Sequence, residues 1–342
     1  MNIRTYLEGK DWACRLVGTF HCMVDSWKRY EFRTEKGNRV PHELRGRFHF
    51  IDRRKKSDAV VIVLAGYKEI LWPTVFDRIH KYTPPNADVC IITSGLINQT
   101  LKDLCKTNGW SYLSTHRNQI ALAQNIAINL HPDAKWICKL DEDMFVTDGY
   151  LEKLQKVHLL AEKETNFEIG FTAPLIPLNG YGHVRILELL NLTEEWEKKF
   201  GKAVCTDGLT HHTAILAAPD AAEFMWGSEC RELQDIDALN SRLSNAQDRP
   251  SYTICPFRFS IGAILFTRRK WQAWRMFPII SGNGMGTDEE FLCKWCSTHS
   301  HAIVVAENTV IGHLGFGPQT KRMLEHYRAH PEQFCAAADR NR

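Results

Sequence analysis

The chain has 342 residues, of which 44% are hydrophobic and 24% are charged, and its formal net charge is +3 at pH 7. This composition is ordinary for a soluble globular protein with one large domain or two. No stretch approaches the roughly 18 consecutive apolar residues that a membrane-spanning helix needs. The first residues lack the apolar centre of a signal peptide. We therefore expect a cytoplasmic protein.

The charge is unevenly distributed along the chain. Residues 1–56 contain 14 Lys or Arg against 7 Asp or Glu, so the remainder is slightly acidic. A basic segment with interleaved aromatic residues is typical of a solvated face, and it can also contact an anionic membrane, a phosphorylated acceptor or nucleic acid. We expect residues 1–57 to form a basic extension that packs on the core. The composition favours the solvated face, with peripheral contact to the inner face of a membrane as the alternative, and we expect no nucleic acid as a partner.

Apolar runs and helical patterns alternate from residue 58 onward. This alternation predicts an α/β fold, in which a mostly parallel sheet is flanked by helices and ligands bind at the carboxyl ends of the strands. In chain order, the patterns predict a strand over Ala59–Leu64, a helix over Val75–Tyr82, a strand over Val89–Thr93, helices over Thr100–Lys106 and Ile120–Leu130, a strand over Trp136–Leu140, a helix over Tyr150–Lys163 and a strand over Glu168–Ala173.

The regular alternation ends at the Pro- and Gly-containing stretch Pro174–Gly182. We divide the core, residues 58–320, into halves over 58–173 and 174–320, followed by a C-terminal helix or tail over 321–342. In the second half the patterns predict mainly helices over 183–256, a strand over Phe257–Thr267, a Gly-rich loop and helix over Gly282–Trp295, and a strand and loop over Ala302–Gly317.

The eleven cysteines follow no regular disulfide framework, so we expect reduced thiols. Cys293 and Cys296 form the only C-x-x-C string, inside a helical pattern and without a second pair at zinc-finger spacing. This context favours packing over metal or redox chemistry. The aromatic residues Trp271, Trp274 and Phe277 recur at a spacing of three, which favours a buried helix side over stacking on sugars.

Two Asp-x-Asp strings occur in the chain, where chance predicts about one. Asp141 and Asp143 directly follow a predicted buried strand, where acidic side chains can hold a hard divalent cation. The structural alternative for this pair is a turn or helix cap before the next helix. Asp235 and Asp237 lie in a polar stretch with helical spacing, and we expect them on a solvated helix face.

Four motifs in this order resemble a glycosyltransferase of the GT-A fold, most closely the inverting family-2 type. The segment AGYKE at the end of the first strand is similar to that family's Pro-x-Tyr-Asn-Glu loop, which grips the nucleotide. The segment Asp141–Asp143 falls where the family places its Asp-x-Asp motif. The resemblance therefore implies nucleotide-sugar binding by Asp141 and Glu142. From the first loop it implies donor contacts by Ala65, Gly66, Tyr67 and Glu69.

The other two motifs follow in the second half. GMGTDEEFLCKW, Gly284–Trp295, is similar to the Glu-Asp motif that opens a helix and supplies the catalytic base. It implies Asp288 as the base and Glu289 as its alternative. VIGHLG, Val310–Gly315, resembles the C-terminal strand and loop whose histidine completes the metal site, which here is His313. The likeness covers roughly residues 58–317, and the order of the motifs carries it.

The sequence departs from the family pattern at three places. The second strand ends in IITSG instead of an Asp pair, so Thr93 and Ser94 are left to contact the base by hydrogen bonds. The helix before the metal motif carries Gln124 in place of an arginine, and Arg117, with Asn118 beside it, is our candidate substitute. Thr287 replaces the usual glutamate before the catalytic aspartate.

The resemblance implies a metal-dependent transferase that moves a sugar from a nucleotide diphosphate, UDP- or GDP-linked, to a hydroxyl of a glycan, glycolipid or protein. It implies inversion at the anomeric carbon and a place in glycan or polysaccharide synthesis. The cation is Mn²⁺ or Mg²⁺, with Asp143 as direct ligand, His313 as a further ligand and Asp141 acting through water or the ribose. We expect residues 174–256 to shape the acceptor side, where the adjacent His211 and His212 contact the acceptor or lie on the surface.

Two other functions fit parts of the sequence. A sugar-nucleotide nucleotidyltransferase shares a similar sheet and metal use, but its first loop is usually Gly-rich and contains Arg, unlike AGYKE. The other alternative is a non-catalytic module that binds a nucleotide sugar or a glycan as an interaction platform, against which the two carboxylates of the Asp-x-Asp segment also argue. The additional carboxylate of Asp288 favours catalysis over this module.

Overall fold

A computed structural model describes residues 47–337 except 208–212, 247–250 and 281, together with Met23 and Leu44. The chain divides into two units, residues 1–46 and 47–342. Nearly all of the basic extension, and also His211 and His212, lie outside the described residues. Residues 47–57, which the sequence analysis assigned to the extension, belong to the second unit.

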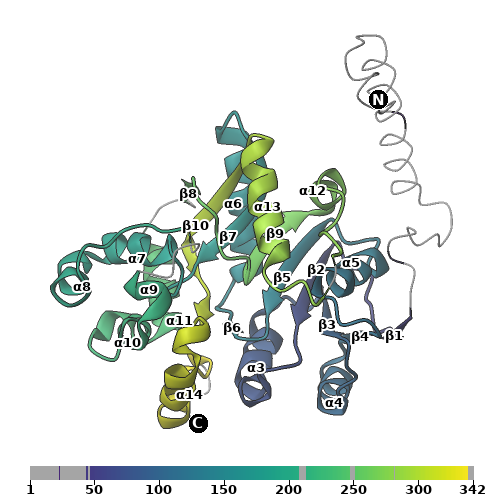
Figure 1. The fold of residues 1–342 in the computed structure, drawn as a ribbon, viewed down its shortest axis with the longest axis horizontal. Helices are drawn as coiled ribbons and strands as arrows, with labels where there is room; N and C mark the ends of the chain where they lie inside the picture. Colours follow the sequence, from purple (N-terminus) through teal and green to yellow (C-terminus); the bar gives the residue numbers. More distant parts are fainter. Residues whose placement is uncertain are drawn as a thin grey trace, which may run out of the picture. The chain divides into compact units, whose positions relative to one another are not determined.

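A nine-stranded sheet forms the centre of the described part of the second unit, in the order β1-β4-β3-β2-β5-β9-β7-β10-β8 (Figure 1). Strands β4, β3, β2 and β5 are parallel, as are β7 and β10, whereas β1, β9 and β8 run antiparallel to their neighbours. A second sheet pairs β6 with β11. The strands are β1 (Phe48–Ile51), β2 (Ala59–Leu64), β3 (Asp88–Ser94), β4 (Ser111–Thr115), β5 (Trp136–Asp141), β6 (Met144–Phe145), β7 (Glu168–Leu175), β8 (Tyr252–Cys255), β9 (Ala263–Thr267), β10 (His301–Val310) and β11 (Gly312–His313).

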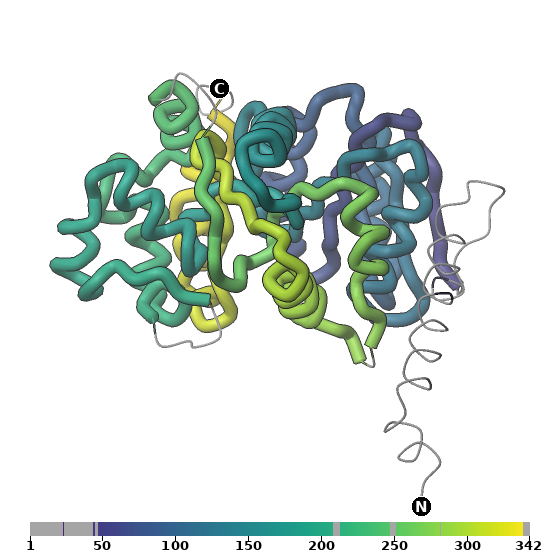
Figure 2. The backbone as a smooth tube through the Cα atoms, turned by 90° about the horizontal axis from the view of Figure 1, so that it is seen from above, coloured from purple at the N-terminus to yellow at the C-terminus, as the bar shows by residue number. Residues whose placement is uncertain are grey.

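Helices cover both sides of the large sheet. Helix α5 packs on β2, β3 and β4, and α6 packs on β7 and β10. Helix α13 also packs on β10, on the side opposite α6 (Figure 2). The helices are α3 (Trp72–Tyr82), α4 (Gln99–Asn108), α5 (Ile120–Leu130), α6 (Tyr150–Glu164), α7 (Gly182–Leu190), α8 (Thr193–Phe200), α9 (Ala214–Ala217), α10 (Pro219–Met225), α11 (Ile236–Asn245), α12 (Arg268–Ala273), α13 (Thr287–Thr298) and α14 (Thr320–Ala329). Short 3-10 helices lie at Glu69–Leu71, Arg231–Leu233, Gly317–Gln319 and Pro331–Gln333.

The predicted fold class, α/β with a mostly parallel sheet flanked by helices, is confirmed by the strand order and directions. The central strands are apolar without alternation because helices cover both of their faces. The side chains of residues 60–63 in β2, for example, are completely buried.

The second half of the unit differs from its prediction at two strands. Tyr252–Cys255 forms the edge strand β8, within a stretch predicted to be mainly helical. The strand predicted over Phe257–Thr267 begins only at Ala263. The preceding residue, Gly262, lies against the metal motif, where its carbonyl oxygen accepts a hydrogen bond from the Asp141 amide at 2.8 Å. Strand β9 runs on from this contact, antiparallel to β5.

Strands β1 and β4 are absent from the predicted elements. β4, with the sequence SYLST, is wholly buried although three of its five residues carry hydroxyl groups on short side chains. A buried strand with polar side chains is not detected by a prediction that relies on hydrophobic pattern.

The second Asp-x-Asp string is only partly on the surface, so the predicted solvated face is wrong for Asp237. Its carboxylate forms an ion pair with the completely buried Arg78, with Nη2 and Oδ1 2.5 Å apart. The guanidinium also donates to the carbonyl oxygens of Val146 and Phe334, which ties α3 to the C-terminal segment. Asp235 caps α11 by accepting hydrogen bonds from the amides of Asp237 and Ala238.

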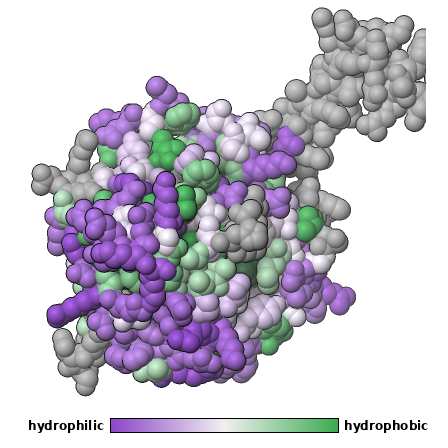
Figure 3. All heavy atoms as spheres, turned by 60° about the vertical axis from the view of Figure 1, so that its left-hand side comes forward, coloured by the Kyte–Doolittle hydropathy of each residue, from purple (hydrophilic) through white to green (hydrophobic). Residues whose placement is uncertain are grey.

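For the described cysteines the predicted reduced thiols are confirmed, and the predicted burial of the aromatic group is confirmed, whereas its predicted position on one helix side is wrong. All cysteines between residues 47 and 337 are free thiols, and Cys293 and Cys296 are buried in α13. Trp271, Trp274 and Phe277 are all buried, and the last two pack on Phe266, but only Trp271 lies within α12, which ends at Ala273. None of the helices in the described part of the chain has the length and apolar character to cross a membrane. Hydrophilic and hydrophobic residues are mixed on the face drawn in Figure 3.

The Arg78–Asp237 pair gives a test of the fold. Replacing Asp237 by Ala leaves a buried guanidinium without its charge partner, which typically costs about 3–5 kcal/mol of stability. Asp235→Ala removes only a helix cap, worth about 1 kcal/mol. Urea unfolding of both variants should therefore show a much larger loss for Asp237→Ala. Equal losses would contradict the buried-pair assignment.

Candidate active site

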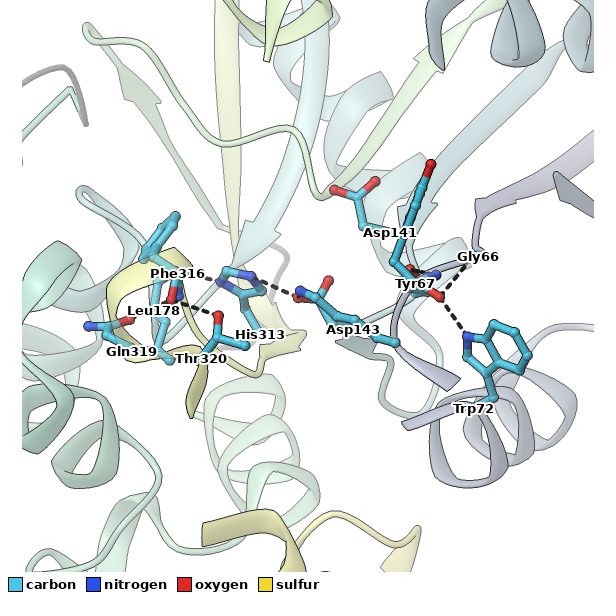
Figure 4. A network of polar contacts seen from close by, with 12 residues as sticks. Gly66, Tyr67, Trp72, Asp141, Asp143, Leu178, His313, Phe316, Gln319 and Thr320 are labelled. Carbon is cyan, nitrogen blue, oxygen red and sulfur yellow. Dashed lines mark hydrogen bonds and ion pairs between the residues drawn. The ribbon is translucent and has the colours of Figure 1, made fainter. Parts of the chain in front are cut away.

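The carboxyl end of β5 carries the first aspartate of the metal motif. Lys139 and Asp141 are two residues apart and so project from the same face of the strand. The buried Lys139 ammonium donates to Asp141 Oδ1 and to the Ile261 carbonyl oxygen, both at 2.8 Å. The Asp141 carboxylate is thus bound to a lysine of its own strand, and it lies apart from the Asp143 carboxylate (Figure 4).

Glu142 connects the metal motif to the loop after β2. Its carboxylate accepts hydrogen bonds from the amides of Gly66 and Tyr67, both at 2.9 Å, and from the indole of Trp72 at 2.6 Å. Gly66 has a φ of 149°, a conformation that favours glycine. Glu142 therefore shapes the loop that the sequence assigns to the nucleotide, and its oxygens are occupied within the protein.

Asp143 lies between the loop after β2 and the small sheet that β6 forms with β11. The pairing of Met144 in β6 with His313 in β11 brings these two segments together. Asp143 Oδ2 lies 3.3 Å from His313 Nε2 and forms an ion pair with the Lys68 ammonium. One carboxylate oxygen therefore has an imidazole and a cation next to it (Figure 4).

The orientation of His313 is set by its second ring nitrogen. Nδ1 lies 3.4 Å from the Leu178 carbonyl oxygen, which can only accept a hydrogen bond, so Nδ1 carries a proton. Trp226 holds the backbone from the other side by donating to the His313 carbonyl oxygen at 3.0 Å. Nε2 faces the Asp143 carboxylate, and these two atoms can lie this close only with a proton or a metal cation between them. Metal-ligating histidines commonly have such a carbonyl partner.

The two aspartates differ in acidity. Burial alone raises the pKa of Asp143, but His313 and Lys68 outweigh it and hold this pKa well below its usual range. The pKa of Asp141 is raised, mainly by burial and further by the negative charges of Asp143 and Asp288, against the opposing effect of Lys139. Asp143 is therefore the more readily ionised carboxylate of the motif.

The predicted base residues open α13 close to this cluster. Asp288 is buried, and its carboxylate accepts hydrogen bonds from Gln124 Nε2 at 2.9 Å and from the Glu289 amide at 3.0 Å. Glu289 forms an ion pair with Arg258 at 2.7 Å and is partly exposed. Burial raises the pKa of Glu289, although Arg258 opposes the shift. Gln124 thus contacts the candidate base from the position where the family pattern has an arginine.

Lys139 is attracted both by Asp141 at the end of β5 and by Asp288 and Glu289 at the start of α13. Burial alone lowers the pKa of its ammonium, but Asp141 and Asp288 more than offset this effect and raise it. The structure therefore brings the motif from β5 and the motif from α13 to one site.

Thr93 and Ser94, which were predicted to contact the nucleotide base, form hydrogen bonds within the protein instead. The buried Thr93 hydroxyl donates to the Leu96 carbonyl oxygen at 2.7 Å, and Ser94 Oγ accepts from the Gln119 amide at 2.6 Å. The Ser94 bond joins the end of β3 to the start of α5, and the Thr93 bond joins the end of β3 to the loop that follows it. Within the described residues, neither hydroxyl has a hydrogen bond to residues 141–143.

The remaining residues predicted to contact the nucleotide sugar lie in the loop after β2 and just before α5. Tyr67 is 66% exposed, and Glu69 is also exposed, whereas Ala65 is buried at the strand end. Arg117 and Asn118 are exposed, and Arg117 donates to the Ile280 carbonyl oxygen at 2.9 Å.

Four residues of the site were not assigned a role from the sequence: Lys68, Lys139, Gln124 and Arg258. Lys68 and Lys139 each neutralise one aspartate of the motif, and both lie within segments that the motifs already marked. A lysine inside the apolar run WICKL is a usable signal, because a lysine is seldom fully buried without a partner. Arg258 is distant from α13 in sequence, so only the fold reveals its contact.

Comparisons with known proteins give structural neighbours only. No family model and no curated protein matches the chain. A mannosyltransferase, PcManGT from Pyrobaculum calidifontis with GDP-Man and Mn²⁺, is similar at a TM-score of 0.43 and 11% identity, over 91% of this chain and 70% of that one. GalNAc-T7 with UDP, GalNAc and Mn²⁺ gives 0.41 and 12%, over 81% of this chain and 51% of that one. A mycobacterial protein gives 0.39 and 13%, over 82% and 75%.

The depressed pKa of Asp143 gives a prediction for stability against pH. Because the folded-state pKa is below the unfolded value of about 4, the carboxylate stabilises the fold fully above that value. Its contribution is lost as the pH falls toward the folded-state pKa. The difference in unfolding free energy between the wild type and Asp143→Asn should therefore shrink below about pH 4. Urea unfolding from pH 7 to pH 3 measures it, and a constant difference would contradict the assignment.

Proposed function

We propose that the protein is a metal-dependent glycosyltransferase that moves a sugar from a nucleoside diphosphate to an acceptor hydroxyl, with inversion, in glycan or polysaccharide synthesis. The observation that carries this proposal is the meeting of three segments at the carboxyl ends of β2 and β5. Asp143, His313 and the loop held by Glu142 lie together there, and the carboxylates of α13 are close by. Such a strand-end site is where α/β sheets bind nucleotides.

Asp143 and His313 fit as ligands of a divalent cation whose remaining coordination positions are filled by the nucleotide and water. Among the described residues no group of three or more His, Cys, Asp or Glu side chains is arranged to hold a metal alone. Asp143 Oδ2 and His313 Nε2 nevertheless converge within 3.3 Å. Magnesium-type sites keep several waters and take one or two protein carboxylates plus phosphate oxygens. We therefore assign Asp143 and His313 as ligands of Mn²⁺ or Mg²⁺, with Asp141 beside them.

The cation, when bound, neutralises the charge that develops on the leaving diphosphate. The protein supplies the remaining groups. The loop over residues 65–69, with its backbone ordered by Glu142, is our proposed platform for the base and ribose, where Tyr67 offers an exposed ring. Thr93 and Ser94 order the neighbouring strand end, and Arg117 and Asn118 border the same side.

Inverting transfer needs one base that takes the acceptor proton as the hydroxyl attacks the anomeric carbon. We assign this role to Asp288, since its negative charge raises the pKa of Asp141 and, in the described part of the chain, its oxygens accept hydrogen bonds from an amide side chain and a backbone amide without a cation partner. Glu289 is bound to Arg258 and remains the alternative.

A cavity of about 660 Å³ extends from Arg258 along α13 and offers a site for the acceptor. This volume is typical of small-molecule pockets. The exposed Phe257 and Phe167 line it, and Arg258 connects it to Glu289. Aromatic faces beside charged groups suit a sugar, which presents both apolar faces and hydroxyls.

Nucleotide binding tests the proposal. We expect the melting temperature to rise by several degrees with either UDP or GDP in the presence of manganese, because a ligand that binds only the folded state stabilises it. The rise should vanish with chelator and in Asp143→Ala. The same protein should release the nucleoside diphosphate from one activated sugar. Binding without any release would favour the non-catalytic module, and no binding of any nucleotide would refute the proposal.

The roles of Asp288 and Glu289 in α13 can be distinguished by isosteric substitution. Asp288→Asn should lower kcat by about 100-fold or more, the usual effect of losing a general base. Glu289→Gln should lower it less and leave the nucleotide-induced thermal shift intact. Steady-state kinetics of both variants, with melting curves to check folding, decide the assignment. A larger loss in Glu289→Gln would move the base to Glu289.

A further inference from the structure

Lys68 places a cation on the oxygen that the proposed metal needs. Its ammonium pairs with Asp143 Oδ2, and His313 Nε2 lies 3.3 Å from that same oxygen. Asp143 is nearly buried, while the Lys68 side chain is 31% exposed. An ammonium ion therefore neutralises the carboxylate in the free protein.

The backbone next to Lys68 is held in place, whereas its side chain has freedom. Glu142 binds the amides of Gly66 and Tyr67, so the stem of Lys68 starts from an ordered loop. The ammonium itself has Asp143 as its hydrogen-bond partner in the described chain. Lys139 differs, because it is buried and bound to both Asp141 and the Ile261 carbonyl oxygen. Of the two lysines at the motif, Lys68 is the one that can move.

An ammonium and a divalent cation cannot share one carboxylate oxygen, because like charges a few ångströms apart repel by several kcal/mol even near a protein surface. Binding of the metal at Asp143 Oδ2, the oxygen next to His313, therefore displaces Lys68 from that oxygen. A lysine is a flexible point charge that binds phosphate well. Its loop borders the proposed nucleotide site, so the released ammonium has the diphosphate within its neighbourhood.

We propose that Lys68 and the divalent cation exchange at Asp143, and that the displaced ammonium binds the diphosphate of the donor. This inference rests on the proposed function. In the free protein Lys68 weakens metal binding, and in the ternary complex it strengthens nucleotide binding. Metal and nucleoside diphosphate then bind with positive coupling, which is reciprocal by thermodynamic necessity.

Lys68→Met tests the exchange, with Lys106→Met on the exposed side of α4 as the matched control. Electron paramagnetic resonance of free Mn²⁺ measures metal affinity without nucleotide, and calorimetry measures UDP or GDP binding to the metal-loaded protein. Relative to wild type, Lys68→Met should bind Mn²⁺ alone roughly tenfold more tightly and the nucleotide roughly tenfold more weakly, since a charge-assisted contact is lost in each case. Lys106→Met should match wild type in both.

Lys68→Gln, which keeps a polar side chain without the charge, should shift both affinities in the same directions. An unchanged or weaker Mn²⁺ affinity in both Lys68 variants, with normal melting curves, would overturn the exchange. Wild-type protein that binds Mn²⁺ but no nucleotide would instead refute the proposed function. The metal-only titration then still decides whether Lys68 competes for Asp143.

Discussion

The site depends on one carboxylate, Glu142, that faces into the protein. By accepting two backbone amides of the loop after β2 and the indole of Trp72, it binds the end of β5 to the end of β2. This attachment orders the loop so that Lys68 reaches Asp143. Since buried carboxylates are stable only with full hydrogen bonding, the three donors also explain how Glu142 is tolerated there.

Charge is balanced locally around this connection. Asp143, Asp141 and Glu289 each have one cation of their own, respectively Lys68, Lys139 and Arg258. Asp288 has an amide side chain and a backbone amide as partners instead, and Glu142 likewise has only uncharged donors in the described residues. A polar cluster with matched charges can be held close to a sheet end without the large cost of an unpaired buried ion. In each of these ion pairs, a charged ligand could take the place of one partner without leaving the other partner's charge unpaired.

Much of the first half of the fold could be predicted from hydrophobic pattern. The runs AVVIVL and WICKL are strands because both of their faces are covered, and α5 begins and ends at the predicted residues. The pattern failed for β4, whose buried residues are largely hydroxylic, and for β8, a short edge strand of mixed burial. It also failed for Asp237, because the buried Arg78 that pairs with it is 159 residues away in the chain. No local pattern carries that information.

The sequence by itself determined the class of the fold and the segments that form the site, because strand and helix periodicity and the order of the motifs are local properties of the chain. Only the tertiary structure decided what each polar group does. It directs Glu142 to the loop backbone, Thr93 and Ser94 to internal partners, and Gln124 to Asp288. These contacts join residues far apart in sequence, and they depend on how strands β2, β3 and β5 and helices α5 and α13 pack at one end of the sheet.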